Sequence, residues 1–136
     1  MSGKVNARAL LAMAEEARGA SYSPYSGISV GAALLTATGK VYRGANIENA
    51  SYSPTICAER VAFFKAISEG ECDFIAFAIA GGESGKPSKA DFPPCGVCRQ
   101  VMAEFCGSDF RIVLGENDTL TLGELLPHGF DKDKIK

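Results

Sequence analysis

The sequence predicts a three-layer α/β/α fold built on a mixed central β-sheet. Segments with apolar residues at helical spacing alternate along the chain with short runs of β-branched and small apolar residues. Two of these runs flank "ATGK", whose glycine suits the turn of a β-hairpin. The resulting order, α-β-β-α-β-α-β-α, is typical of a mixed sheet between helical layers.

The first third of the chain is expected to form a helix and a hairpin. The first 18 or so residues read as an amphipathic helix that ends at Gly19. Its apolar side carries Leu10, Leu11, Ala14 and Ala17. Residues 28–36 suit a largely buried strand, and residues 41–46 suit the strand that returns from the turn.

The middle third predicts a helix followed by a strand. A loop at residues 47–55 loses periodicity and gains Asn, Ser and Pro, and a helix follows from about Ile56 to Ser68. The side chains that this helix offers to the core are Val61, Ala62, Phe64 and Ile67. Residues 74–82 are apolar without alternation, which indicates a central strand covered on both faces.

The last third predicts a helix at residues 94–106 with Pro94 at its start, a strand at 111–115 and a short helix at 121–127. The first of these helices carries four apolar side chains at helical spacing: Val97, Val101, Met102 and Phe105. The chain shows no internal repeat, linker or low-complexity segment, and 136 residues suffice for one hydrophobic core. Residues 1–136 are therefore expected to form a single domain.

Composition and charge restrict the kinds of partner. A formal net charge of -2 with 22% charged residues leaves no excess of positive charge to hold a polyanion, so neither a nucleic acid polymer nor a membrane is expected as a partner. The N-terminus lacks the unbroken apolar run of a signal peptide, and no stretch approaches the length of a membrane span. Five cysteines, an odd number, favour reduced thiols or metal ligands in the cytoplasm over a disulfide framework.

Three of the cysteines form a candidate metal site. Cys95 and Cys98 lie three residues apart at the start of a predicted helix, so both sulfurs can reach one ion, and Cys57 at another helix start supplies a third thiolate. A structural zinc site closes its coordination with a fourth protein ligand, whereas a catalytic site leaves that position to water. The residues that could close it lack ligand spacing: Cys72, Cys106 and His128. An open coordination position is the better interpretation.

Two charged residues beside Cys57 fit such a site. Glu59 is close enough in sequence to touch a metal-bound water and to accept its proton, whose pKa zinc lowers from about 15.7 to about 7. Three thiolates around Zn²⁺ leave an excess of negative charge, which a guanidinium donating to the sulfurs would offset. Arg60 is the first candidate for that role, and Arg99 is the second.

The motif "CAE" at residues 57–59, followed by "PCGVC" at residues 94–98, resembles the zinc-dependent cytidine deaminases. The segments "SPYSGISVGAALLT", "VYRGANIENASYSPTICAER", "PCGVCRQVMAEF" and "ELLPHGF" are similar to those of the small homotetrameric enzymes that act on free nucleosides. The resemblance covers about residues 5 to 130. Polynucleotide and tRNA deaminases typically carry histidine as first metal ligand, whereas this chain carries Cys57.

The resemblance implies a role for each matching residue. One Zn²⁺ per subunit would be bound by Cys57, Cys95 and Cys98, and Glu59 would carry protons from the zinc-bound water to the pyrimidine and the leaving ammonia. The backbone of Ala58 would contact the base. Ribose hydroxyls would be bound by Asn46 and Glu48. Neighbouring subunits of a homotetramer would contribute Ala50, Tyr52 and Phe130 to a shared site. Ile28 stands where many relatives carry a phenylalanine that packs on the nucleoside.

The expected activity is hydrolytic deamination of cytidine and 2′-deoxycytidine to the corresponding uridines, in pyrimidine salvage. One alternative is a deaminase for an altered substrate, such as a modified cytosine or the nucleoside antibiotic blasticidin S. Another is a non-catalytic module in which zinc only joins two helices.

Individual residues also have simpler interpretations. The cysteines and Glu59 could mark two unrelated helix starts, and Arg60 could form an ordinary surface ion pair. Asn46 and Glu48 could be ordinary polar loop residues, and Tyr52 and Phe130 could serve only in packing. Three further residues are expected to have no role in the site: Cys72 and Cys106 as small buried hydrophobes, and His128 as a turn residue.

Overall fold

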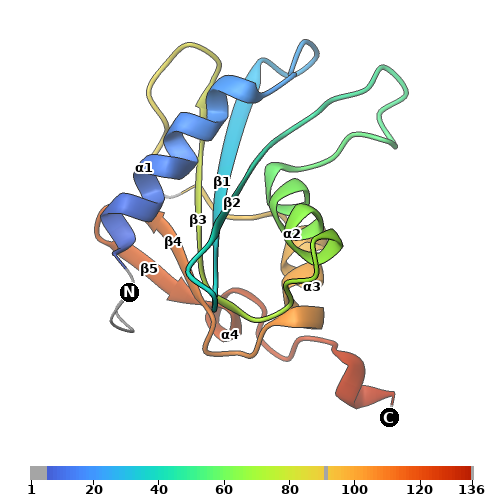
Figure 1. The fold of residues 1–136 in the computed structure, drawn as a ribbon. Helices are drawn as coiled ribbons and strands as arrows, with labels where there is room; N and C mark the ends of the chain where they lie inside the picture. Colours follow the sequence, from blue (N-terminus) through green and yellow to red (C-terminus); the bar gives the residue numbers. More distant parts are fainter. Residues whose placement is uncertain (1–5, 91, 136) are drawn as a thin grey trace.

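A five-stranded mixed sheet forms the centre of the structure, a computed structural model that describes residues 6–90 and 92–135 (Figure 1). The strands lie in the order β2-β1-β3-β4-β5. Strands β3 and β4 are parallel, and the other neighbouring pairs are antiparallel. The bounds of the strands are β1 Ile28–Thr36, β2 Val41–Ala45, β3 Phe74–Glu83, β4 Arg111–Gly115 and β5 Asp118–Thr121.

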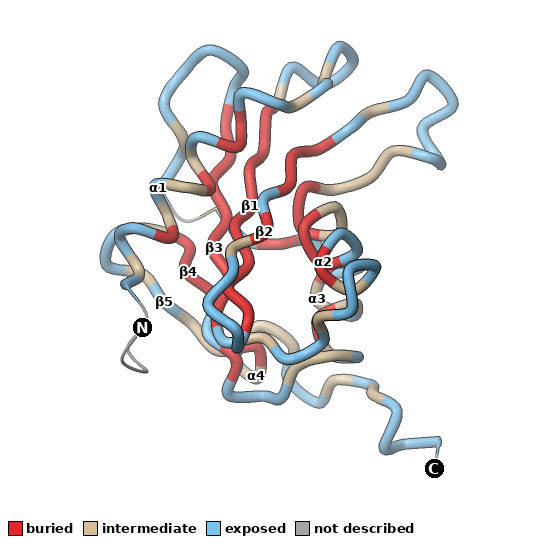
Figure 2. Tube along the Cα trace, viewed as in Figure 1, coloured by how far each residue is buried: buried red, intermediate tan, exposed pale blue. Residues whose placement is uncertain are grey.

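Helices cover both faces of this sheet, which confirms the predicted three-layer α/β/α fold. Helix α1 (Ala7–Ala17) packs on one face, and α2 (Ala58–Ser68) and α3 (Gly96–Phe105) pack on the other (Figure 1). Alternate residues of β1 enter the two cores: Ala33 and Leu35 contact the α1 side, whereas Ala32 and Leu34 contact the α2 side. Burial is accordingly concentrated on the central strands and on the inner sides of the helices (Figure 2).

Three shorter helices complete the chain. A 3-10 turn, Arg18–Ala20, follows α1, and a second one, Lys132–Lys134, lies near the C-terminus. Helix α4 (Leu122–Leu125) starts with a capping box, in which Thr121 and Glu124 each satisfy a backbone N–H of the other. None of the described helices is long and apolar enough to cross a membrane.

Two glycines allow α1 and α2 to lie directly on the hairpin. A Cβ atom on Gly31 would lie 1.9 Å from the carbonyl oxygen of Ala14 in α1. A Cβ atom on Gly44 would lie 2.3 Å from the carbonyl oxygen of Ala58 and 2.7 Å from the amide nitrogen of Ala62, both in α2. Because these atoms belong to the helix backbone, they cannot rotate away, and the first turn of α2 is placed by this contact.

The predicted strands 28–36 and 111–115 have the bounds that the structure gives. Some helices differ from the prediction in their bounds and in which of their side chains face the core. The short helix expected at 121–127 is preceded by the unpredicted edge strand β5 and spans only four residues. In α2 the buried phenylalanine is Phe63, whereas Phe64 is 44% exposed. The helix is apolar on several sides, so its sequence could not show which side contacts Gly44.

Other corrections concern α3 and the cysteines. Helix α3 begins at Gly96, and Pro94 is buried just before the helix. Val97, expected on the core side, is 59% exposed. Cys72 is exposed in the loop before β3, so its predicted burial is wrong, whereas Cys106 is partly buried against the core. The expectation of helix before residue 6 lies outside the described residues.

We predict that Gly44→Ala lowers the free energy of unfolding by about 3 kcal/mol, because the added methyl group meets backbone atoms that cannot move aside. Gly19→Ala is the matched control, since nothing lies within 4 Å of a Cβ atom there, and it should change stability by no more than about 0.5 kcal/mol. Urea denaturation followed by circular dichroism measures both. Equal stability of the two variants would show that α2 does not depend on the contact with Gly44.

Candidate metal centre

Three cysteine sulfurs and one carboxylate meet where α2 and α3 begin. The Sγ atoms of Cys57 and Cys95 are 3.6 Å apart, and those of Cys95 and Cys98 are 3.2 Å apart. The Glu59 carboxylate belongs to the same group, in which all four ligand atoms lie within 4.8 Å of one another. The structure therefore brings together residues that are 41 positions apart in the chain (57 to 98).

The start of α2 holds Cys57 and Glu59. Cys57 is the N-cap residue with an extended backbone, and Glu59 lies in the first turn of the helix. A pair of backbone hydrogen bonds between Ile47 and Ile56, 3.0 and 2.9 Å long, fixes the chain immediately before Cys57. This two-residue bridge and the contact with Gly44 together place the first turn of α2.

The start of α3 holds the other two cysteines. Cys95 is the N-cap residue, and its sulfur accepts the backbone N–H of Cys98 at 3.4 Å. Arg99 does not reach the sulfurs: its guanidinium donates to the carbonyl oxygens of Pro94 at 2.9 Å and of Leu125 at 2.6 Å. Arg99 therefore holds the turn that carries Cys95 in place. Because its guanidinium is bound to these two carbonyl oxygens, Arg99 does not offset the negative charge of the thiolates.

Hydrogen bonds within the cluster shift the pKa values of its thiols. The Cys98 thiol, and to a smaller extent the Arg60 guanidinium 3.6 Å away, lower the pKa of Cys57 to about 5. The pKa of Cys98 is raised, chiefly because its thiol donates to Cys57 and also because it is buried. These contacts favour ionisation of Cys57, and the thiolate is the form that binds zinc.

Glu59 is buried, with only 4% of its surface exposed. Burial raises the pKa of its carboxyl group, and the charge of nearby Cys57 raises it further. A buried carboxyl group with a raised pKa can hold a proton and release it again, which an exposed carboxylate does poorly at neutral pH.

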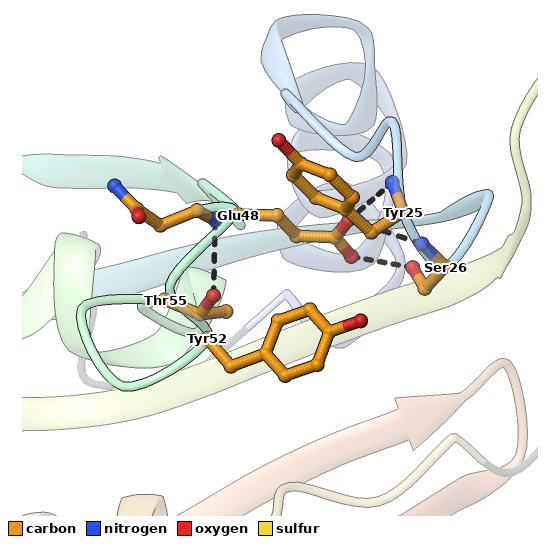
Figure 3. Close-up of a pocket in the computed structure, with 6 residues that line it drawn as sticks. Tyr25, Ser26, Glu48, Tyr52 and Thr55 are labelled. Carbon is orange, nitrogen blue, oxygen red and sulfur yellow. Dashed lines mark hydrogen bonds between the residues drawn. The ribbon is translucent and has the colours of Figure 1, made fainter.

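A pocket of about 340 Å³ lies between the loop before β1 and the loop before α2 (Figure 3). Its lining comprises Tyr25, Ser26, Glu48, Asn49, Tyr52 and Thr55. The rings of Tyr25 and Tyr52 meet edge to face, with centroids 6.3 Å apart. The sequence indicated Glu48 and Tyr52 as site residues but not Tyr25 or Ser26, because Ser, Pro, Tyr and Gly in "SPYSG" are also typical of an ordinary turn.

The remaining predicted site residues fall into two groups. Asn46 is buried, and its side chain is hydrogen-bonded to Ser21, to the amide of Val30 and to the carbonyl oxygen of Ile28. The side chain of Ile28 packs on the hydrophobic core. Ala58 is buried at the first position of α2, where the backbone N–H has no partner within the helix. The other group is exposed at the surface: Ala50, Tyr52 and Phe130.

The donor set fits zinc. Tetrahedral zinc with Zn–S bonds of about 2.3 Å requires sulfurs about 3.8 Å apart. The Cys57–Cys95 separation of 3.6 Å is close to that value, and the Cys95–Cys98 separation of 3.2 Å is shorter, so these two sulfurs would move apart slightly to bind the ion. Thiolates are preferred zinc ligands, and no histidine is needed. Three thiolate ligands that leave a zinc position open to water, with a buried acidic side chain beside it, are the arrangement expected of a zinc hydrolase.

Comparisons with known proteins identify the family within this class. The model of the cytidine and deoxycytidylate deaminase zinc-binding region matches residues 4–115. Cytidine deaminase of Halalkalibacterium halodurans is 48% identical over 130 residues, which cover 93% of this chain and 95% of the relative. Cytidine deaminase of Sporosarcina psychrophila is 45% identical over 130 residues, 93% of this chain and 92% of the relative.

Solved structures agree with these relatives. A crystal structure of cytidine deaminase from Burkholderia pseudomallei has a TM-score of 0.82 and 41% identity, and covers 93% of this chain and all of that chain (100%). Cytidine deaminase from Mycobacterium tuberculosis has a TM-score of 0.82 and 38% identity over 93% of this chain and 98% of that chain. The chain belongs to the zinc-dependent cytidine and deoxycytidylate deaminase family, as its motifs predicted.

We predict that Cys95→Ala loses stoichiometric zinc, because two thiolates remain where three are needed. Cys72→Ala is the matched control: both cysteines are exposed, but Cys72 lies outside the cluster. Metal content per chain, measured by plasma emission spectroscopy after dialysis, should fall below about one tenth of an equivalent in the first variant and stay near one in the second. Full zinc occupancy in Cys95→Ala would overturn the assigned ligand set.

Proposed function

We propose that this chain catalyses the hydrolytic deamination of cytidine and 2′-deoxycytidine to uridine and 2′-deoxyuridine, with release of ammonia, in pyrimidine salvage. The observation that carries the proposal is the buried Glu59 carboxyl group, within 4.8 Å of each sulfur of a cluster of three cysteines. The names of the relatives support the choice of substrate, since two of them at 48% and 45% identity are cytidine deaminases.

Zinc bound by Cys57, Cys95 and Cys98 would supply an acidified water, with a pKa near 7, as the nucleophile. Glu59 would take one proton from that water and pass it to the ring nitrogen N3 as the water oxygen adds to C4 of the pyrimidine. It would then pass the second water proton to the amino group, which leaves as ammonia when the C4–N bond breaks, and the oxygen remains as the carbonyl of uridine. Burial raises the pKa of this carboxyl group above its ordinary value, which favours its service as an acid after it has acted as a base. Such positioned proton transfer contributes about a hundred- to ten-thousand-fold in rate.

Arg60 adjusts the charge of the centre in this proposal. Its guanidinium donates to the Cys57 sulfur at 3.6 Å, which withdraws negative charge from that ligand. Less electron-rich sulfur ligands leave the metal a stronger Lewis acid. Arg60 is partly buried, and its Nε atom has no hydrogen-bond partner among the described residues, so the guanidinium is held beside the cluster at some cost in solvation.

The pocket lined by Tyr25, Glu48 and Tyr52 would receive the nucleoside. The backbone N–H of Ala58, at the first position of α2 and without a partner inside the helix, would contact the pyrimidine edge. Glu48, which lines the pocket, would contact a ribose hydroxyl. Asn46 has most of its hydrogen-bonding capacity committed to the protein, so its contribution to ribose binding would come from the second hydrogen of its amide group. Ile28 packs on the core, and its aliphatic side chain would stand where an aromatic ring could otherwise pack on the nucleoside.

A homotetramer with shared active sites is part of the proposal. Tyr52 and Phe130 are 72% and 58% exposed, so both rings are accessible to a neighbouring chain. Tyr52 also adopts a left-handed backbone with φ of 63°, a strained state that loops keep where a side chain must project. A cytoplasmic location is proposed as well, and the five free cysteines support it.

We predict that Glu59→Gln keeps one zinc per chain but reduces kcat for cytidine at least about a thousandfold, because the amide cannot carry a proton. Turnover is followed by the fall in ultraviolet absorbance as cytidine becomes uridine, and zinc is measured on the same sample. An active variant would remove the proton-transfer role. Loss of zinc would instead identify Glu59 as a metal ligand and favour a structural zinc site.

A second test addresses assembly. Sedimentation velocity of the wild-type protein should give a single species of four chains, and the double variant Tyr52→Ala/Phe130→Ala should lose activity or assembly, since both rings would contribute to a neighbouring site. Phe64→Ala, which removes an exposed ring on the outer side of α2, is the control. A fully active monomer would contradict the shared site.

A further inference from the structure

The Glu48 carboxylate is held by a small cage of donors from the loop before β1. Its Oε1 atom accepts the backbone N–H groups of Tyr25 at 2.9 Å and of Ser26 at 3.1 Å. Its Oε2 atom accepts the hydroxyl group of Ser26 (Figure 3). One residue, Ser26, therefore contacts both oxygens of the carboxylate.

The direction of the Ser26 hydroxyl group is fixed by a second contact. Its Oγ atom accepts the backbone N–H of Ile28 at 3.0 Å. Because an amide N–H can only donate, the hydroxyl hydrogen remains free to point at Glu48. A directed chain thus runs from Ile28, the first residue of β1, through Ser26 to the carboxylate, and it ties Glu48 to the sheet.

This cage determines what Glu48 can offer to a ligand. The Ser26 hydroxyl, more than any other group, lowers the pKa of Glu48, and the two backbone N–H groups lower it further. An ionised carboxylate has about four acceptor positions, of which three are filled here. The fourth position is on Oε2, and Glu48 lines the 340 Å³ pocket. The group is an acceptor only, so it matches a donor such as a sugar hydroxyl.

We propose that Ser26 is a positioning residue that orients the Glu48 carboxylate toward a hydroxyl group of the substrate's sugar and so contributes to selection of hydroxyl-bearing nucleosides. The proposal rests on the proposed function, in which Glu48 contacts the ribose. Ser26 itself acts through Glu48 and does not need to touch the substrate.

The loop around Ser26 is held without its side chain, which separates positioning from folding. Backbone hydrogen bonds join Tyr22 to Asn46 at 3.0 Å, Glu48 to Tyr22 at 2.8 Å and Ser84 to Gly27 at 2.8 Å. Ser26 is also exposed, so its replacement leaves no cavity in the core. Ser26→Ala is therefore expected to fold with nearly unchanged stability.

A double-mutant cycle tests the proposal on the zinc-loaded enzyme. The four proteins are the wild type, Ser26→Ala, Glu48→Ala and the double variant, and the readouts are kcat and KM for cytidine and the calorimetric Kd for uridine. We expect Ser26→Ala to raise KM and Kd about tenfold with kcat changed less than about twofold. In the Glu48→Ala background the same substitution should change KM and Kd less than about twofold, because the group it orients is gone.

Further variants and analogues separate this role from a general effect on the loop. Ser26→Thr keeps the hydroxyl group and should restore most of the lost affinity. Ser23→Ala is the control, since its hydroxyl contacts Ser21 and Ser84 and not Glu48. Comparison of cytidine with its 2′-deoxy and 3′-deoxy analogues should show that Ser26→Ala and Glu48→Ala reduce discrimination against the same analogue.

The results of the double-mutant cycle distinguish failure of the proposal from failure of the proposed function. An equal effect of Ser26→Ala with and without Glu48 would overturn the proposal, as would a fall in kcat matched by a fall in melting temperature. A Glu48→Ala variant with unchanged KM and Kd would overturn both the proposal and the ribose contact, while leaving deamination by the wild type intact. Absence of cytidine turnover in the wild type would remove the proposed function alone, because the cycle can still be followed through uridine binding.

Discussion

The contact between the backbone of α2 and Gly44 is the constraint on which the rest of the metal centre depends. The helix lies so close to β2 that a single methyl group on the strand would overlap the carbonyl oxygen of Ala58. Ala58 directly follows Cys57, so the sheet positions the first metal ligand almost without intervening chain. On the opposite face, Gly31 gives α1 a similar close approach. The absence of two side chains therefore allows three layers to lie close enough for short loops to build a precise site.

The centre is a meeting of two helix starts. At the start of a helix the first backbone N–H groups lack partners within the helix and carry partial positive charge. Cys57 and Cys95 are both N-cap residues, so each of two thiolates lies at such a start. The protein thus stabilises negative charge on sulfur with backbone dipoles and with Arg60, while it withholds solvent from Glu59 a few ångströms away. The charged environment of the sulfurs suits them to bind a metal, whereas the buried environment of Glu59 suits it to carry a proton.

Local patterns predicted the features that depend on neighbouring residues in the chain. The apolar run of residues 28–36 predicts β1 with the bounds that the structure has. The three-residue spacing of Cys95 and Cys98 predicts that their sulfurs lie together, and they are 3.2 Å apart. The meeting of Cys57 with Cys95 and Cys98 is a distant contact that the cysteine motifs indicated, but other features set by distant contacts could not be predicted. Phe63 is buried in place of Phe64 because the facing of α2 is decided by Gly44, which is a residue of another element. Likewise, Ser26 and Glu48 are 22 positions apart, and nothing in either segment alone shows that they are hydrogen-bonded. The edge strand β5 was missed because its four residues owe their extended form to pairing with β4.

The hydrogen-bonded pair formed by Ile47 and Ile56 separates the loop at residues 48–55 from the turn that carries Cys57, so the sequence of the loop can change without a change in that turn. The eight intervening residues, 48–55, form an excursion whose two ends are pinned together, so alterations at its tip do not reach Cys57. Substitutions, insertions or deletions between the two isoleucines can therefore remodel the wall of the pocket while the ligand-bearing turn keeps its place. In evolutionary terms, the choice of substrate and the capacity to hold a metal are two traits that this architecture allows selection to adjust independently.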